Sequence, residues 1–270
     1  MRSLLVYLAA CQSGCASASE ASLPPDLNVM PDLLQPNIRN LLLRALDSQA
    51  FSLLQPAMES VELPVKFELI APYVPSDSVF FLEAGLASLV ATNSDDESVE
   101  VGHIGYEGMA GTHLLLKVEQ TPNRTFMQAA GRGIKMPAAA LLAVLDEVPS
   151  ARDLLLRYTH CCEVQLAQSA LANARYNMSE RLARWILMCH DRLSDDDLPL
   201  THEFLSLMLG VRRSGVTNEI HILEGAHAIK ATRGNIRVLD RQKLEDMAAG
   251  SYGIAEQEYE RYVGFPVRRF

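Results

Sequence analysis

One short segment of the chain concentrates side chains suited to reading nucleic-acid bases: Arg212, Arg213, Ser214, Thr217 and Asn218. An arginine can donate two hydrogen bonds to one guanine, and an asparagine can pair with the edge of adenine. A helix that presents these groups at its N-terminal end could place them against base edges. The segment therefore favours a module that faces nucleic acid.

The elements that would position these groups follow from the spacing of apolar residues. Val216, Ile220 and Leu223 recur at helical spacing, so a helix here would bury them and turn the polar groups outward. A preceding helix opens after Thr201, a suitable N-cap, and Gly210 suits its C-terminal turn. Helix, glycine turn and second helix together predict a helix-turn-helix.

A β hairpin is predicted to follow, with strands at 229–232 and 236–239 around the basic turn Arg233-Gly234-Asn235. This hairpin would form a wing beside the second helix. An ordinary helical hairpin with a solvated basic face is the alternative. The nucleic-acid contacts we predict over the whole region are Thr201, His202, Arg212, Arg213, Ser214, Thr217, Asn218, Lys230 and Arg233.

The charge distribution agrees with a separate anion-facing module. The whole chain has a net charge of −9, from 24 Lys and Arg against 33 Asp and Glu. Residues 198–270 carry ten basic against nine acidic side chains, so the acidic excess lies in the first 197 residues. Such asymmetry supports two parts with different partners.

Composition places the chain among soluble globular proteins. Its 270 residues suggest two domains or one large one, and no apolar run reaches the roughly 18 residues of a membrane span. The five cysteines are an odd and sparse set, which we interpret as reduced thiols in a cytoplasmic protein. Residues 1–29 resemble a secretory leader poorly, and we expect a disordered extension there.

The region 30–149 is predicted to form a β jelly roll after short helices. Alternating apolar residues over 61–69 predict a half-buried strand, which Pro64 restricts to a sheet edge or a bulge. Further short strands separated by polar turns are predicted at 78–82, 86–91, 98–104, 125–129 and 131–136.

A long helix is predicted to connect the two parts. Residues 150–174 contain no glycine or proline, and their apolar stripe needs either the β domain or a second subunit to cover it. Within the connecting region 150–192, Ser179 can cap a further helix, and Asp195-Asp196-Asp197 suggests a polar hinge before the module at 198–264. The fold class is therefore α+β.

The chain resembles the Crp/Fnr family of bacterial transcription regulators from residue 30 to about residue 264. The segment 200–217, which begins Leu-Thr-His-Glu-Phe-Leu, is similar to that family's winged helix-turn-helix, and its base-reading positions fall on Arg213, Ser214 and Asn218. Segments 79–85 and 105–111 resemble its sensor domain. The resemblance implies a cyclic-nucleotide-binding-like roll, a homodimer and a transcription regulator, with double-stranded DNA and RNA polymerase as partners.

The family's effector site transfers less well. Arg124-Thr125 stands where a pair grips a cyclic phosphate, but Gly111-Thr112 lacks the carboxylate that normally follows the glycine. We therefore expect weak binding of cyclic AMP and an effector of unknown identity. Neither Cys11 and Cys15 nor the adjacent Cys161-Cys162 makes a cluster or metal site, and we expect no cofactor.

Two alternatives from other classes remain. An enzyme would need a catalytic signature, and the sequence has no Gly-x-Ser-x-Gly, His-Glu-x-x-His or phosphate-binding loop; we interpret His103 and His113, near Glu107, as structural. The glycines at 102, 105 and 108 are better explained as turn glycines. A ligand- or partner-binding jelly roll with a degenerate DNA-binding domain is the second alternative, because residues 224–228 carry a glycine and a histidine where apolar packing is expected.

Overall fold

The computed structural model describes residues 33–193 and 195–267, so the predicted extension at 1–29 lies outside the described residues. Two four-stranded antiparallel sheets, ordered β1-β8-β3-β6 and β2-β7-β4-β5, form the predicted β roll. The strands are β1 (Glu59–Leu63), β2 (Glu68–Ile70), β3 (Ser78–Leu82), β4 (Leu86–Thr92), β5 (Ser98–Ile104), β6 (Met109–Ala110), β7 (Arg124–Ala129) and β8 (Gly131–Pro137).

The single strand predicted at 61–69 is wrong, because the chain turns after Pro64. β1 ends at Leu63, Lys66 takes a positive φ of 70°, and β2 starts at Glu68. β1 and β2 are edge strands of different sheets, as the missing N–H of Pro64 favours. Val65, an apolar member of the predicted alternation, is 54% exposed. The alternation therefore spanned two strands and the corner between them.

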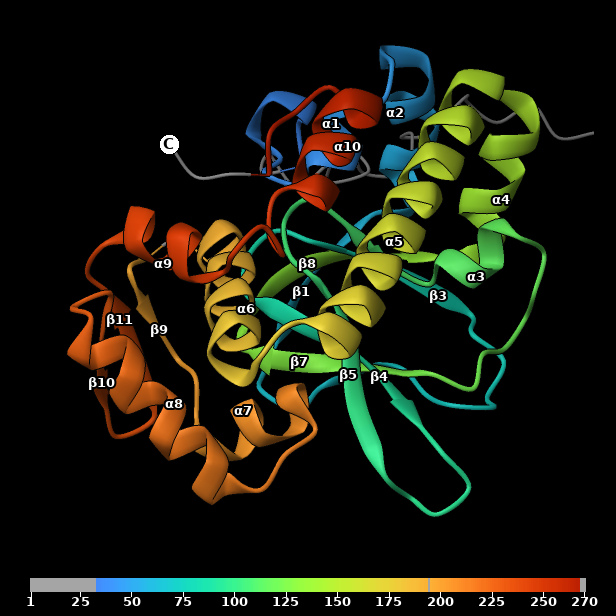
Figure 1. Ribbon diagram of the computed structural model, residues 1–270. Coiled ribbons are helices and arrows are strands. Elements are labelled where there is room, and N and C mark those ends of the chain that lie inside the picture. The colour runs from blue at the N-terminus through green and yellow to red at the C-terminus, as the bar shows by residue number, and fades with distance from the viewer. Residues whose placement is uncertain (1–32, 194, 268–270) are drawn as a thin grey trace, which may run out of the picture. The chain divides into compact units, whose positions relative to one another are not determined.

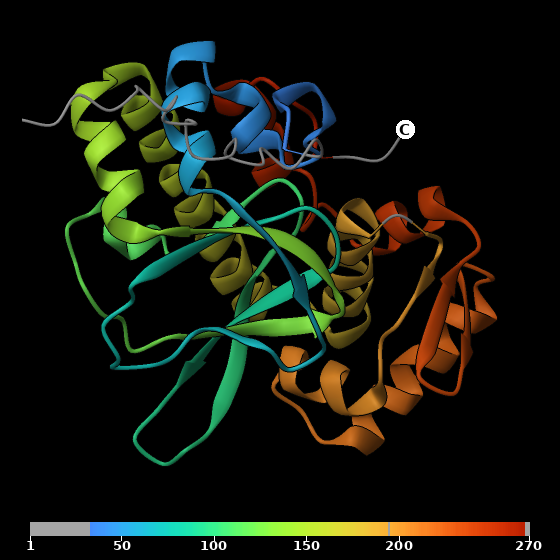
Figure 2. The same cartoon turned by 180° about the vertical axis from the view of Figure 1, so that it is seen from behind.

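Helices cover the roll, and the longest matches its prediction. The helix α5 contains 27 residues and buries Leu154, Leu155 and Tyr158. Figure 1 shows it in front of the strands, and Figure 2 shows the sheets from the opposite side. The helices of this half are η1 (Gln35–Asn37), α1 (Leu41–Ala45), α2 (Ser48–Leu54), η2 (Gln55–Ala57), α3 (Thr112–Leu115), α4 (Ala138–Glu147) and α5 (Pro149–Arg175).

The second half is built around a second apolar cluster, which also includes Leu86 and Ala129 of the roll. Its elements are α6 (Met178–Arg192), β9 (Asp197–Leu198), α7 (His202–Leu209), α8 (Arg213–Gly225), β10 (Ile229–Thr232), β11 (Asn235–Val238), α9 (Arg241–Met247) and α10 (Ile254–Val263). Helices α6 to α9 share one apolar cluster. Asp197, predicted to lie in a hinge, instead belongs to β9 and pairs with Arg237 of β11. The predicted α+β architecture is confirmed.

Helix α6 begins two residues earlier than a Ser179 cap would allow. Asn177 is the N-cap: its side chain accepts from the backbone N–H of Glu180, and the Glu180 carboxylate accepts from the N–H of Asn177. The predicted Ser179 cap is therefore wrong. The Ser179 hydroxyl donates to Glu219 of α8 instead and links two helices.

The helix α10 packs with the first core. Tyr259, Val263 and Val267 are buried in the cluster that contains α1, α4 and α5. Figures 1 and 2 both show α10 beside α1. The chain thus returns to the β roll after it completes the C-terminal module.

The capping box of α6 gives the first prediction. Asn177→Ala should lower the free energy of unfolding by about 1 kcal/mol, because the backbone N–H of Glu180 loses its side-chain acceptor. Urea denaturation measures the change. Asn173→Ala, an exposed change near the end of α5, is the matched control and should have a smaller effect. Equal effects of the two changes would contradict the role of the cap.

Candidate nucleic-acid interface

Three features hold α7 and the tight turn that follows it. The Thr201 hydroxyl accepts from the N–H of Phe204 at 3.2 Å and caps α7, as predicted. Gly210 ends α7 in the left-handed conformation, with φ 64°. Arg181 of α6 donates to the carbonyl of Leu209 at 2.7 Å and holds the end of α7. These contacts fix the direction in which α8 leaves the turn.

Helix α8 is anchored by its apolar side. Val216, Ile220 and Leu223 are at most 2% exposed. Three of the predicted contact residues, Arg212, Ser214 and Asn218, are exposed, and Arg213 is the first residue of the helix. The exposed polar groups lie at the N-terminal end, which is the end that base-reading helices use.

Thr217 and His202 lie next to each other at the same surface. The Thr217 hydroxyl is 3.3 Å from Nδ1 of His202, so the start of α7 and the first turns of α8 form one polar surface. Two predicted contact residues from different helices are thereby brought together. His202 is exposed and Thr217 is half-buried.

The predicted wing is present. β10 and β11 pair in antiparallel register from Ile229↔Val238 to Thr232↔Asn235. Gly234 has φ +77°, which suits the tight basic turn, and Lys230 and Arg233 are exposed. The strand β9 adds a third member to the sheet.

The segment that raised doubt about this module, 224–228, packs in an ordered way. One Glu224 carboxylate oxygen accepts from the N–H of Ala231 at 2.8 Å and ties α8 to the wing. His227 makes the turn with φ 55°, and Ala228 is fully buried. The glycine and histidine of this segment suggested poor packing. Instead, the Glu224 carboxylate and the left-handed His227 make the connection between α8 and the wing. The basis for a degenerate module therefore disappears.

A cavity of about 230 Å³ lies between the β roll and α5. Gly111, Thr112 and Thr125 line it, as predicted for the effector pocket. Arg124 does not line it: its Nε lies 2.6 Å from a Glu68 carboxylate oxygen, and its guanidinium covers the ring of Phe126. The structure thus separates the predicted Arg124–Thr125 pair.

The lining of this cavity combines apolar side chains with uncharged polar groups and carries almost no charge. None of the described residues around it is Lys or Arg, and Glu163 is the one acid among them. Burial lowers the pKa of both His103 and His113, so both imidazoles are neutral near pH 7. Within the described part of the chain, Nε2 of each histidine is buried without a hydrogen-bond partner. The sequence suggested only structural roles for these two residues.

The cysteines of α5 and α6 are inert in this environment. Cys161, Cys162 and Cys189 are free, and burial raises the pKa of Cys161 to about 11 and that of Cys162 to about 12. Their thiols are therefore protonated near neutral pH and are weak nucleophiles. Among the described residues, no group of three His, Cys, Asp or Glu is placed to hold a metal ion.

Two helices joined by a glycine turn, with a wing beside them and a long helix leading back to a double-sheet β roll, define a winged helix-turn-helix protein. Residues 180–247 match the family model of the Crp-like helix-turn-helix domain. The chain therefore carries a Crp-like helix-turn-helix domain, and the predicted resemblance to Crp/Fnr regulators is confirmed.

Solved structures agree on the fold at low sequence identity. A protein from Eubacterium rectale assigned to the Crp/Fnr transcriptional regulators has 13% identity and a TM-score of 0.62, covering 77% of this chain and 98% of its own. FixK2 from Bradyrhizobium japonicum has 14% identity and a TM-score of 0.62, covering 70% and 96%. The c-di-GMP responsive regulator CLP of Xanthomonas campestris has 12% identity and a TM-score of 0.56, covering 71% and 99%. No curated protein matches the sequence.

Beside the cavity, a buried acid and a buried histidine generate the second prediction. Glu100 and His103 lie with Oε1 and Nδ1 3.2 Å apart, and both side chains are fully buried. Burial raises the pKa of Glu100 well above its ordinary value. The folded chain therefore keeps this carboxyl protonated over a pH range in which the unfolded chain ionises it.

Glu100→Gln should become progressively more stable than the wild type as the pH rises from 5 to 7. Folding of the wild type takes up a proton in this window, which costs up to about 1.4 kcal/mol per pH unit, and the variant lacks this cost. Urea denaturation at pH 5, 6 and 7 measures the difference. Glu97→Gln, on the exposed end of the same hairpin, is the control. A difference that stays constant with pH would show that Glu100 ionises normally.

Proposed function

We propose that this protein is a sequence-specific, DNA-binding transcription regulator with a sensor domain in its β roll. The observation that carries the proposal is the exposed N-terminal end of α8, held by Val216, Ile220 and Leu223 within a domain of the Crp-like family. The function is binding rather than catalysis. RNA polymerase as a partner and the cytoplasm as location follow from this role. Within the described residues, no helix is long and apolar enough to cross a membrane.

In this proposal α8 enters the major groove and the wing follows the backbone. Arg213, Ser214 and Asn218 read bases from the first turns of α8, with Arg212, Thr217, His202 and Thr201 beside them. Lys230 and Arg233 contact phosphates from the wing. The division is physical: helix residues can reach base edges inside the groove, whereas a hairpin beside it meets the sugar-phosphate backbone.

A homodimer through α5 supplies the two-fold symmetry that such a protein needs. Leu171 is 45% exposed, and Ala167, Ala170 and Ala174 are exposed on the same side of the helix. Residues at these spacings form a continuous strip, and small side chains allow two helices to approach closely. The strip lies on the part of α5 that follows its buried half.

The effector of the sensor domain is proposed to be small and different from a cyclic nucleotide. The cavity of about 230 Å³ is below the usual size of pockets for drug-sized ligands. It has no cation to hold a phosphate among its described lining residues, and Gly111-Thr112 supplies no carboxylate for a ribose. The neutral imidazoles and threonines suit an uncharged ligand.

DNA binding is tested by comparing Arg213→Ala with Arg233→Ala. Arg213→Ala should weaken binding to a selected site by about 1–3 kcal/mol and relax the preference for one base pair in each half-site, since a bidentate base contact is lost. Arg233→Ala should weaken all sequences alike and lower the slope of log K against log salt by about one unit per subunit. Salt-titrated binding to selected and scrambled DNA measures both.

Arg132→Ala is the control for charge alone, because Arg132 lies on β8 of the roll. It should leave both affinity and salt dependence unchanged. Half-sites should lie about 10 base pairs apart, one turn of the duplex. Equal weakening of selected and scrambled DNA by Arg213→Ala would make Arg213 a phosphate contact. A wild type without sequence preference at any salt concentration would refute the proposed function.

The dimer is tested at the centre of the α5 strip. Ala170→Glu should convert a dimeric wild type into a monomer, because it places two like charges at a close helix contact. Sedimentation velocity measures the mass. Gln49→Glu adds the same charge at an exposed position of α2, outside α5, and should leave the dimer intact. A monomeric wild type, or a dimer that survives Ala170→Glu, would rule out this interface.

A further inference from the structure

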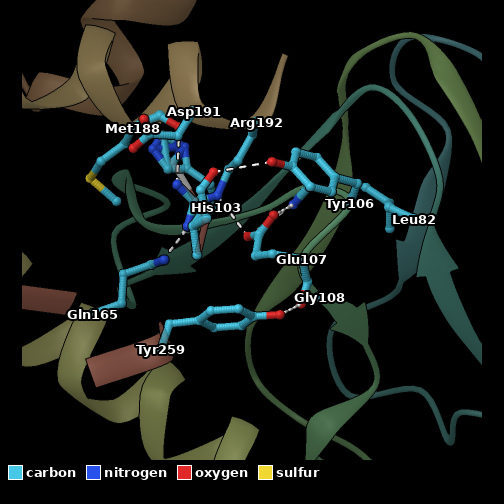
Figure 3. A network of polar contacts seen from close by, with 12 residues as sticks. Leu82, His103, Tyr106, Glu107, Gly108, Gln165, Met188, Asp191, Arg192 and Tyr259 are labelled. Atoms are coloured by element: carbon cyan, nitrogen blue, oxygen red, sulfur yellow. Dashed lines mark hydrogen bonds and ion pairs between the residues drawn. The ribbon is translucent and has the colours of Figure 1, made fainter. Parts of the chain in front are cut away.

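A buried ion pair joins the β roll to the C-terminal module. Nε of Arg192 donates to Oε1 of Glu107 at 2.6 Å, and both side chains are 3% exposed (Figure 3). The N–H of Gly105 also donates to the Glu107 carboxylate, and the Arg192 guanidinium donates to the carbonyl of Met188. Further bonds at each end hold the pair in one geometry.

The two partners belong to different parts of the chain. Arg192 is the last residue of α6, and the apolar side of α6, including Leu182 and Ile186, packs with α7 and α8. Glu107 lies in the turn 105–108, which connects β5 to β6 of the roll. The pair therefore fixes the end of α6 to one particular turn of the sensor domain.

The same turn is flanked on both sides by the wall of the cavity. Gly102 and His103 precede it, Met109 and Gly111 follow it, and all four line the cavity. The ring of His103 lies 3.8 Å, centroid to centroid, from Trp185 of α6. A ligand that displaces this wall must therefore move Glu107 or strain its contacts with α6.

The C-terminal segment is attached at this turn as well. The Tyr259 hydroxyl of α10 donates to the backbone carbonyl of Glu107 at 2.6 Å, and the Tyr106 hydroxyl donates to the carbonyl of Val267 at 3.1 Å. Both modules of the chain, and the segment that returns from the second to the first, meet at four consecutive residues.

Close packing at the turn leaves little freedom to adjust. A Cβ atom at Gly105 would lie 2.7 Å from Cβ of Arg192, and one at Gly108 would overlap the Tyr158 hydroxyl. These two glycines are needed for close approach, in addition to the turn they make. A displacement here is transmitted to the neighbours because a close-packed interior has no voids to absorb it.

Burying a charge pair adds little net stability compared with an apolar contact, but it can select one arrangement of the parts. On the basis of the proposed function, we propose that the Glu107–Arg192 pair couples occupancy of the sensor cavity to the DNA-binding state of α7 and α8. Ligand and DNA each act on the turn 105–108 from opposite ends. Such coupling is reciprocal, so DNA binding alone must change the sensor wall.

The test uses the full chain and the double variant Glu107→Gln/Arg192→Met. Removal of both charges avoids the lone buried charge that either single change would leave. Hydrogen exchange of residues 102–112 is measured with and without a DNA site selected by the wild type. We expect DNA to change exchange there at least threefold in the wild type and to leave it unchanged in the variant while DNA remains bound.

Glu68→Gln/Arg124→Met, which removes an exposed pair of the roll, is the matched control and should respond like the wild type. The proposal is overturned if the double variant responds as the wild type does, or if DNA bound to the wild type leaves residues 102–112 unchanged. A wild type that binds no DNA would instead refute the proposed function.

Discussion

Helix α8 has thirteen residues, and it must bury one side while it leaves polar groups exposed on another. Val216, Ile220 and Leu223 are buried, whereas Ser214 and Asn218 are exposed to water. The rest of the C-terminal module depends on this arrangement. The left-handed Gly210 sets the angle at which this is possible, and Arg181 holds the carbonyl at the preceding residue. The polar surface is thus a consequence of where the apolar side is buried.

Electrostatics in this protein is arranged by depth. Arg212 before α8, and Lys230 and Arg233 on the wing, are exposed and keep their hydration. The charges that are buried, Glu107 and Arg192, lie where the two cores meet. Glu100 and His103 differ from this pair. Burial raises the pKa of Glu100 and lowers the pKa of His103, which favours the neutral form of each side chain. The neutral residues Glu100 and His103 on β5 therefore lie within a few residues of Glu107, which forms the buried ion pair in the following turn.

The sequence predicted what depends on local periodicity. Strands 78–82 and 98–104, the cap at Thr201 and the turn at Gly210 all follow from patterns within a few residues. It failed where distant groups decide. The alternation over 61–69 continued through a corner, because Val65 and Phe67 are apolar without being buried. The outward direction of Arg124 is set by Glu68, 56 positions earlier. Glu107 drew attention only as a neighbour of histidines, because its partner lies 85 positions away.

The return of α10 to the first core has a consequence for how the protein is made. The hydroxyl that bonds to the carbonyl of Glu107 belongs to a residue 152 positions later in the chain. Domains commonly fold from the N-terminus as they leave the ribosome. Here the β roll is synthesised before the residues that cover one side of α5. Tyr259 and Val263 can pack there only after the whole C-terminal module has been synthesised. Completion of the β roll during translation therefore follows synthesis of the C-terminal module.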